Sequence, residues 1–445
     1  MASILSYVPV TGRRVRSSQA KLGSVNLAPV QVHQIETNPD RRARCLKHLL
    51  KANHVNYSIA YSDNLISGNC SPHLLSTAYL LGASEVKLHA LYEEGIKSLE
   101  PWTPSPAEIV DLDWTDFLGD KRYQRAYVDF FEDKLAMTFA YDWKQEAEHF
   151  LFSGERPLVH VLIGGRTVPR VLEQAQNANP HLVGRSLIHL AYAYEMDCKE
   201  VGMEALGLAC VEYDFLHKYT DDASYTKPSP LASGSPLDLL TKISEDERFN
   251  SLPKNIDVGQ LEALFEEHED LIMEYWNAWE LDDLSEQFQQ SQETAVSLAV
   301  ALVGPDIHTY DFLLVHLLTI SHAARILLPF FPPQYQNTIV RQWWLIAIIV
   351  FIIKGRPRPN SDNVQKEIGD KDWKYVESQA LTSRWSKDAH YIKGERAACH
   401  ARHDWMLTDT AIRAMREASK TWGDAQRECI RAAVTFVDNF ERWNV

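Results

Sequence analysis

Apolar residues recur at every third or fourth position through long stretches of this 445-residue chain, which is the spacing of a buried helix face. Clear stretches begin at His73 (HLLSTAYLLGASEVKLHALYEEGIKSLE), Leu187 (LIHLAYAYEM) and Tyr310 (YDFLLVHLLTISHAARILL). Glycine and proline, which interrupt helices, number only 19 and 20. A strand-rich fold would show turn signals about every 8 to 12 residues, and the sequence lacks them. The pattern therefore predicts an all-α fold.

The helical pattern has few strong breaks. Residues 226–236 (TKPSPLASGSP) predict a surface loop, and the prolines of LLPFFPPQYQ and KGRPRPNSDN predict helix ends. Histidines of chemical interest lie on both sides of the loop. We therefore expect one large helical domain over residues 31–445, with a buried metal site between its core helices. Residues 1–30 are expected to form a flexible N-terminal segment.

The longest apolar run is WWLIAIIVFII, the 11 residues from Trp343 to Ile353. A helix needs about 20 apolar residues to cross a bilayer, so this run predicts a core helix that is buried on all sides. The sequence thus predicts no membrane span. A peripheral membrane contact is the alternative.

Composition limits the partners of the chain. Its formal net charge of −15 argues against a nucleic-acid binder, which would need a basic face, and favours a small or neutral partner. Six cysteines without any CxxC pair are typical of reduced thiols rather than of a disulfide framework. The N-terminal residues do not form a secretory signal. These features favour a cytoplasmic protein.

Fingerprints of organic cofactors are missing from the sequence. It has no GxGxxG or Walker loop, no GxSxG elbow and no HExxH motif. Residues 162–169 (LIGGRTVP) hold a glycine pair that predicts a simple turn. Redox chemistry would therefore need a different source.

Histidine is the residue type that suggests such a source. The chain has 17 histidines, several of them inside apolar helical stretches. Burial of an imidazole is costly unless its ring nitrogens have partners. His189 and His316 each lie among leucines, where either a hydrogen-bonded core position or a metal-ligand position accounts for them. His322 follows His316 by six residues and is expected to face elsewhere.

Helical geometry groups the remaining candidates, because residues three or four apart share a face. His390 and Lys393 can therefore reach one point, and Asn69 can act together with His73. The HARH stretch at residues 400–403 is a rival pair, for which a solvent-facing position is the simpler interpretation.

A lysine beside a ligand histidine needs an explanation, because a divalent cation repels an ammonium group. Burial lowers the pKa of a lysine and leaves a neutral, reactive amine. Such an amine can add carbon dioxide, and the resulting carbamate would give Lys393 an anionic oxygen ligand of the kind that iron sites take from Asp or Glu. The alternative is a charged surface residue near Asp388 and Glu395.

Five stretches resemble the questin oxidase-like family of fungal polyketide enzymes, and they lie in order along most of the chain. They are NCSPHLLSTAYLLGAS (69–84), LIHLAYAYEM (187–196), YDFLLVHLLTISH (310–322), VRQWWLIAIIVFIIKGRP (340–357) and DAHYIKGERA (388–397). Two positions depart from the family pattern. Cys70 stands where the family has the first histidine of an Asn-His-x-x-His run, and Arg185 stands where it often has another histidine.

The resemblance implies a single non-haem iron(II), with dioxygen as co-substrate. The residues that it implies as ligands are His73, His189, His316, His390 and a carboxylated Lys393. It further implies Thr319, one turn from His316, beside bound oxygen. The alternative role of Thr319 is an ordinary hydrogen bond back to a carbonyl of its own helix. Tyr192 and Asn69 are expected to contact the substrate. Trp343 and Trp344 could form flat walls for an aromatic substrate, although core packing is the simpler interpretation.

The implied activity is a dioxygenase that opens the central ring of an anthraquinone or anthraquinol polyketide to a benzophenone-type product in fungal secondary metabolism. A second hypothesis is an NADPH-dependent Baeyer–Villiger-type monooxygenase of the same substrates, which would need a reductase partner because the dinucleotide fingerprint is missing. A third is a non-catalytic helical protein that binds a polyketide. The sequence indicates neither the oligomeric state nor the particular substrate.

Overall fold

Helices account for nearly all regular structure in the computed structural model, and the predicted all-α class is confirmed. The structure describes residues 24–62, 65, 67–154, 156–163, 184–252, 256, 261–304, 307–382, 398–423 and 426–444, except for the side chains of 398–409 and 444. His390 and Lys393 thus lie outside the described residues.

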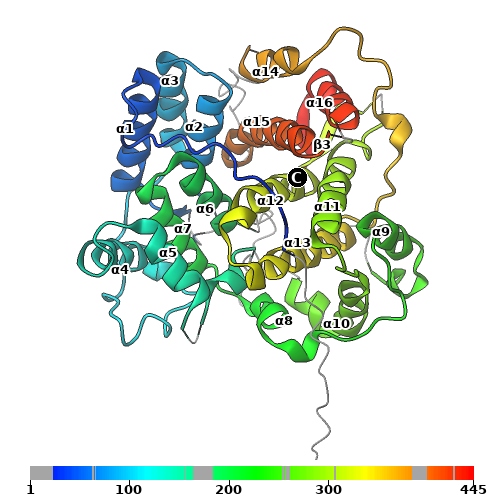
Figure 1. The fold of residues 1–445 in the computed structure, drawn as a ribbon, viewed down its shortest axis with the longest axis horizontal. Coiled ribbons are helices and arrows are strands. Elements are labelled where there is room, and N and C mark those ends of the chain that lie inside the picture. The colour runs from blue at the N-terminus through cyan, green and yellow to red at the C-terminus, as the bar shows by residue number, and fades with distance from the viewer. Residues whose placement is uncertain are drawn as a thin grey trace, which may run out of the picture.

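The first group of helices lies on one side of the molecule (Figure 1). Its members are α1 (Arg41–Asn56), α2 (Ser71–Leu80), α3 (Glu85–Gly95), α4 (Gln124–Met137), α5 (Trp143–Phe152), α6 (Arg185–Met196) and α7 (Lys199–Val211). The short antiparallel strands β1 (Ala60–Tyr61) and β2 (Ser67–Gly68) precede α2.

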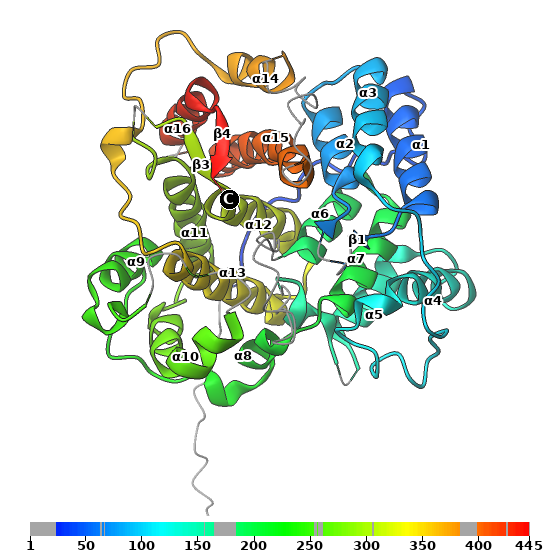
Figure 2. The same cartoon turned by 180° about the vertical axis from the view of Figure 1, so that it is seen from behind.

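The second group fills the other side, as the view from behind also shows (Figure 2). Its members are α8 (Lys218–Asp221), α9 (Pro236–Glu245), α10 (Leu261–Ala278), α11 (Leu284–Val300), α12 (Phe312–Leu327), α13 (Pro333–Ile353), α14 (Trp373–Thr382), α15 (Ala398–Thr421) and α16 (Gln426–Asn439). Strands β3 (Thr309–Asp311) and β4 (Arg442–Asn444) pair in parallel beside α16.

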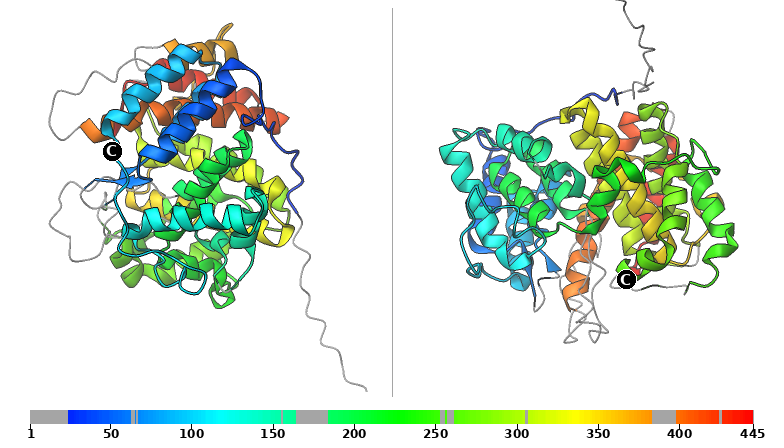
Figure 3. Two further views of the ribbon diagram at one scale, coloured as in Figure 1. Left: turned by 90° about the vertical axis from the view of Figure 1, so that its left-hand side faces the viewer. Right: turned by 90° about the horizontal axis from the view of Figure 1, so that it is seen from below.

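Four helices join the two groups. Helix α12 packs against α6 and α15, and α2 packs against α6 and α15. The two groups are best separated in the view from below (Figure 3, right). One continuous set of buried apolar side chains nevertheless runs through both groups, so they share a core.

Helices α6 and α12 are the central elements, because every residue of each is buried. An all-round buried helix needs an apolar sequence, and both stretches supply one. The carboxylate of Asp311 accepts hydrogen bonds from the backbone N–H groups of Leu313 and Leu314 and so begins α12. Pro329 and Pro332 separate α12 from α13, as the prolines predicted.

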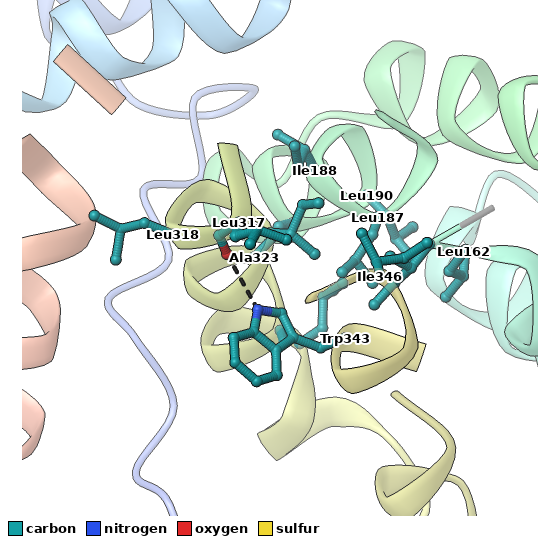
Figure 4. Packing of buried hydrophobic residues seen from close by; sticks show 14 of the residues in the cluster. Leu162, Leu187, Ile188, Leu190, Leu317, Leu318, Ala323, Trp343 and Ile346 are labelled. Atoms are coloured by element: carbon teal, nitrogen blue, oxygen red, sulfur yellow. Dashed lines mark hydrogen bonds between the residues drawn. The ribbon is translucent and has the colours of Figure 1, made fainter. Parts of the chain in front are cut away.

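Helix α13 contains the long apolar run, and all its residues from Trp343 to Ile353 are buried, as predicted. The Nε1–H of Trp343 donates to the carbonyl oxygen of Leu317 in α12 at 3.1 Å (Figure 4). By length and apolar character, Phe312–Phe330 and Pro333–Ile353 would both be long enough to cross a membrane. They are 94% and 83% buried, as core helices are.

The helical stretch that begins at His73 is divided in two. Gly82 adopts a φ of +95°, which a glycine reaches without strain, and so ends the run after α2. Ser84 then begins α3, because its hydroxyl accepts from the backbone N–H of Lys87. The loop predicted at residues 226–236 is confirmed, with α9 beginning at Pro236.

Candidate active site

Two of the predicted ligand histidines meet in the core between α2 and α6. The Nε2 atom of His73 lies 2.6 Å from Nδ1 of His189, and the ring centroids are 4.3 Å apart. The two residues are 116 positions apart in the sequence. Both side chains are almost fully buried, at 6% and 1% exposure. Facing imidazole nitrogens of this kind can share a proton or bind one metal ion.

Tyr192 covers the other side of this pair. Its ring stacks on that of His73 at 5.3 Å, and the guanidinium of Arg413 lies over the Tyr192 ring at 5.6 Å. The Tyr192 hydroxyl shares a hydrogen bond of 2.5 Å with the hydroxyl of Thr77. Tyr192 therefore borders the pair, and its predicted contact with a substrate stays a prediction.

A buried carboxylate lies behind His189, on the side away from His73. Oε2 of Glu204 in α7 is 3.4 Å from Nε2 of His189. The other oxygen of Glu204 is 3.0 Å from Nδ1 of His54 in α1. Nε2 of His54 in turn lies 2.9 Å from Oε1 of Glu132 in α4, whose side chain is 42% exposed. The chain of contacts thus runs from the histidine pair to the surface.

The charges in this chain of contacts support one another. Burial opposes the charge of His54, but hydrogen bonds to Glu132 and Glu204 outweigh it and raise the pKa of His54 to about 10. Burial would also raise the pKa of Glu204, yet contacts with His189 and His54 lower it. The hydrogen bond from His54 lowers the pKa of Glu132 against the opposing effect of burial. His54 is therefore a buried imidazolium between two carboxylates.

The raised pKa of His54 predicts a loss of stability in mild alkali. A group whose pKa is about 10 when folded and 6.5 when unfolded stabilises the fold fully below pH 6.5, and this contribution disappears as the pH rises to 10. At about 1.4 kcal/mol for each pKa unit, the loss is on the order of 4 kcal/mol. Urea unfolding of the protein and of His54→Asn between pH 6.5 and 10 should show a steep decline only in the former. Parallel declines would contradict the assignment.

His316 and Thr319 lie one turn apart in α12, and both side chains are buried, at 3% exposure each. The His316 ring stacks on Phe312 at 6.1 Å. The hydroxyl of Thr319 has no hydrogen-bond partner within the described part of the chain. The alternative role of Thr319, a bond back to its own helix, is therefore not observed there.

The complete ligand set stays a prediction. Among the described residues, no three or more His, Cys, Asp or Glu side chains come together to hold a metal ion. His73 and His189 do meet, and α12, which bears His316, packs against α6. The remaining predicted ligands, His390 and Lys393, precede α15 and lie outside the described residues.

Asn69 has a structural role at the start of α2. Its Nδ2–H donates to Oδ1 of Asn53 at 3.1 Å, and its Oδ1 accepts from the backbone N–H of Ser71 at 3.1 Å. These bonds fix the segment that leads to His73. A contact between Asn69 and the substrate stays a prediction.

The two departures from the family pattern lie near each other. Arg185 is buried and forms an ion pair with Glu212, and the charges of both act on the thiol of Cys70. Burial raises the pKa of that thiol to about 11. Gly68 allows the close approach of Arg185, because a Cβ there would overlap the guanidinium.

The structure also shows the surroundings of the tryptophans, the cysteines and His322. Trp343 and Trp344 are core residues, and the Nε1–H of Trp344 donates to the carbonyl oxygen of Tyr275 at 3.2 Å. The five cysteines with described side chains are free thiols, as expected. His322 is buried, and burial together with Arg413 and Arg325 lowers its pKa well below the usual value.

The sequence matches the profile of a known protein family. The profile of the questin oxidase-like family matches residues 68–398, which is most of the chain and includes α2, α6, α12 and the segment of His390 and Lys393. The chain belongs to the questin oxidase-like family. Membership indicates an oxidative enzyme that modifies anthraquinone-type compounds. No curated protein matches the sequence significantly.

Two of the described histidines are compatible with part of a metal site. Two imidazole nitrogens converge, and the histidine of α6 has a carboxylate behind it, which is the usual surrounding of a metal-ligating histidine. Sequence analysis did not single out His54, Glu132 or Glu204. The available signal was Glu204 itself, a lone acid in the apolar stretch VGMEALGLAC.

Proposed function

We propose that the protein is a non-haem iron(II) dioxygenase that opens the central ring of an anthraquinone or anthraquinol polyketide. The observation that carries the proposal is the buried contact between His73 and His189, in a chain that belongs to the questin oxidase-like family. Neutral imidazoles with one anionic oxygen donor are suited to ferrous iron.

The ligand set of the proposal combines His73, His189 and His316 with His390 and a carboxylated Lys393. When bound, the iron would supply the one-electron chemistry that lets dioxygen react with an organic substrate. The carbamate of Lys393 would contribute the anionic donor, since among the described residues no three or more His, Cys, Asp or Glu side chains come together to hold a metal ion.

Residues of α6 and α12 would serve the reaction in separate ways. The Thr319 hydroxyl, buried and without a partner in the described residues, is free to donate a hydrogen bond to an oxygen atom of a bound ligand. Tyr192 keeps the His73 ring in place by stacking. The apolar surroundings of α6 and α12 would exclude water from the bound substrate.

Isotope labelling tests the proposed reaction. Protein purified without oxygen and loaded with iron(II) is mixed with an anthraquinol and ¹⁸O₂, and the product is analysed by mass spectrometry. A dioxygenase incorporates both oxygen atoms and needs no NADPH. Incorporation of one atom with consumption of NADPH, in the presence of a reductase, would favour the Baeyer–Villiger alternative instead. Tight binding of the anthraquinol without any product would indicate the non-catalytic alternative.

A further inference from the structure

Glu204 is a buried charge beside the histidine pair that the proposed reaction does not use. Its side chain is 1% exposed, and each carboxylate oxygen faces a different histidine. An isolated carboxylate in such a position would be very costly. The cost of burying this charge must therefore be offset by groups nearby.

His54 provides the compensation. Both of its ring nitrogens lie within 3.0 Å of carboxylate oxygens, which only accept hydrogen bonds. A neutral imidazole has a lone pair on one nitrogen and would repel one of the two carboxylates. With both carboxylates ionised, the geometry calls for a doubly protonated His54, which donates to Glu132 on one side and to Glu204 on the other. Glu204 is thereby kept as an anion.

The second oxygen of Glu204 then determines the proton position in His189. Oε2 of Glu204 and Nε2 of His189 are 3.4 Å apart, which is a charge contact rather than a hydrogen bond, and neither atom has a hydrogen-bond partner among the described residues. A lone pair on Nε2 would face the anionic oxygen, so the proton belongs on Nε2. The opposite nitrogen, Nδ1, then carries the lone pair.

We propose that Glu204, supported by His54, is a positioning residue that keeps the proton of His189 on Nε2 and presents the Nδ1 lone pair to His73 and to a metal ion. In the metal-free pair, Nε2–H of His73 then donates to Nδ1 of His189 across the 2.6 Å contact. A metal ion would replace that proton. The metal part of this inference rests on the proposed function, whereas the proton position in the metal-free protein does not.

The proton position can be measured directly in metal-free protein. Nitrogen chemical shifts of ¹⁵N-histidine distinguish a protonated from an unprotonated ring nitrogen, and the His189 signals are assigned by their loss in His189→Gln. We expect Nε2 protonated and Nδ1 unprotonated in the unchanged protein. A proton on Nδ1 would overturn the proposal without the need for any further variant.

Glu204→Gln tests the role of the carboxylate. An amide has only one acceptor oxygen, so it cannot accept from both His54 and His189, and we expect the His189 signals to shift toward a mixture of the two proton positions. Glu204→Asp keeps both acceptors and should retain much of the original signal. The matched control is Glu212→Gln. It removes another buried carboxylate, which lies at the end of α7 and pairs with Arg185. Equal His189 signals in Glu204→Gln and in the unchanged protein would overturn the proposal.

Iron(II) titration separates this inference from the proposed function. Loss of a residue that orients a metal-ligating histidine typically weakens metal binding about 10- to 100-fold. We expect that decrease for Glu204→Gln and unchanged affinity for Glu212→Gln. If the unchanged protein binds no iron, the proposed function fails while the nitrogen shifts still test the proton position. If the unchanged protein binds iron and Glu204→Gln binds it equally well, the positioning role of Glu204 is refuted while the proposed function stands.

Discussion

Glutamine in place of Glu146 is expected to raise the free energy of unfolding at pH 7 by about 3 kcal/mol. Glu146 lies in α5 with no exposed surface, and neither carboxyl oxygen has a hydrogen-bond partner among the described residues. Burial raises its pKa to about 8, against the opposing effect of Lys134. The folded protein must therefore hold a proton that the unfolded chain releases above pH 4.5.

The sign of this effect follows from the raised pKa. Between pH 4.5 and 8 the folded state binds more protons than the unfolded state, so stability falls as the pH rises through this interval. Glu146→Gln does not ionise in either state and should remove the decline.

Urea unfolding at pH 4.5 and pH 7 measures the difference in the free energy of unfolding between Glu146→Gln and the unchanged protein. We expect Glu146→Gln and the unchanged protein to be similar at the lower pH and to diverge at the higher. Glu148→Gln, on the exposed side of the same helix, is the matched control and should change little. An equal gain at both pH values would show that packing, and not ionisation, is responsible.

Alanine in place of His316 is expected to weaken iron(II) binding about 100-fold or more, with a matching loss of activity. His316 is buried in α12, the helix that packs against α6 and its His189. As a proposed ligand, it would contribute one of the donors on which the iron depends.

His322→Ala is a matched control for this change. It lies in the same helix, is buried to the same degree, and loses the same side chain. Both variants leave a cavity in the core, so both should lose stability by a similar amount. Only His316→Ala should lose iron. Equal iron affinity in the two variants would mean that His316 is a core histidine.

Local spacing predicted much of the fold, because helical periodicity is a property of short stretches. It predicted the buried helix at Trp343–Ile353, and the prolines predicted where α12 gives way to α13. Periodicity did not reveal the break at Gly82, since the apolar spacing continues across it. The break depends on the positive φ of Gly82, which is a property of the backbone and leaves the apolar spacing unchanged.

The site was less predictable, because its contacts join distant segments. Helical geometry could pair Asn69 with His73, yet the structure gives Asn69 bonds to Asn53 and Ser71. The contact between His73 and His189 was implied only by the family resemblance. His54 and Glu204 are 150 positions apart, and no local pattern indicates that a single acid in an apolar helix has a histidine on either side.

Anomalous diffraction at the iron absorption edge tests most directly whether the histidines of α2, α6 and α12 hold one ion. Crystals of protein loaded with iron(II) in the absence of oxygen would be measured on both sides of the edge. The proposed function predicts one peak per chain, at about 2 Å from nitrogens of His73, His189 and His316. A peak remote from these nitrogens, or no peak in protein that still converts its substrate, would contradict it.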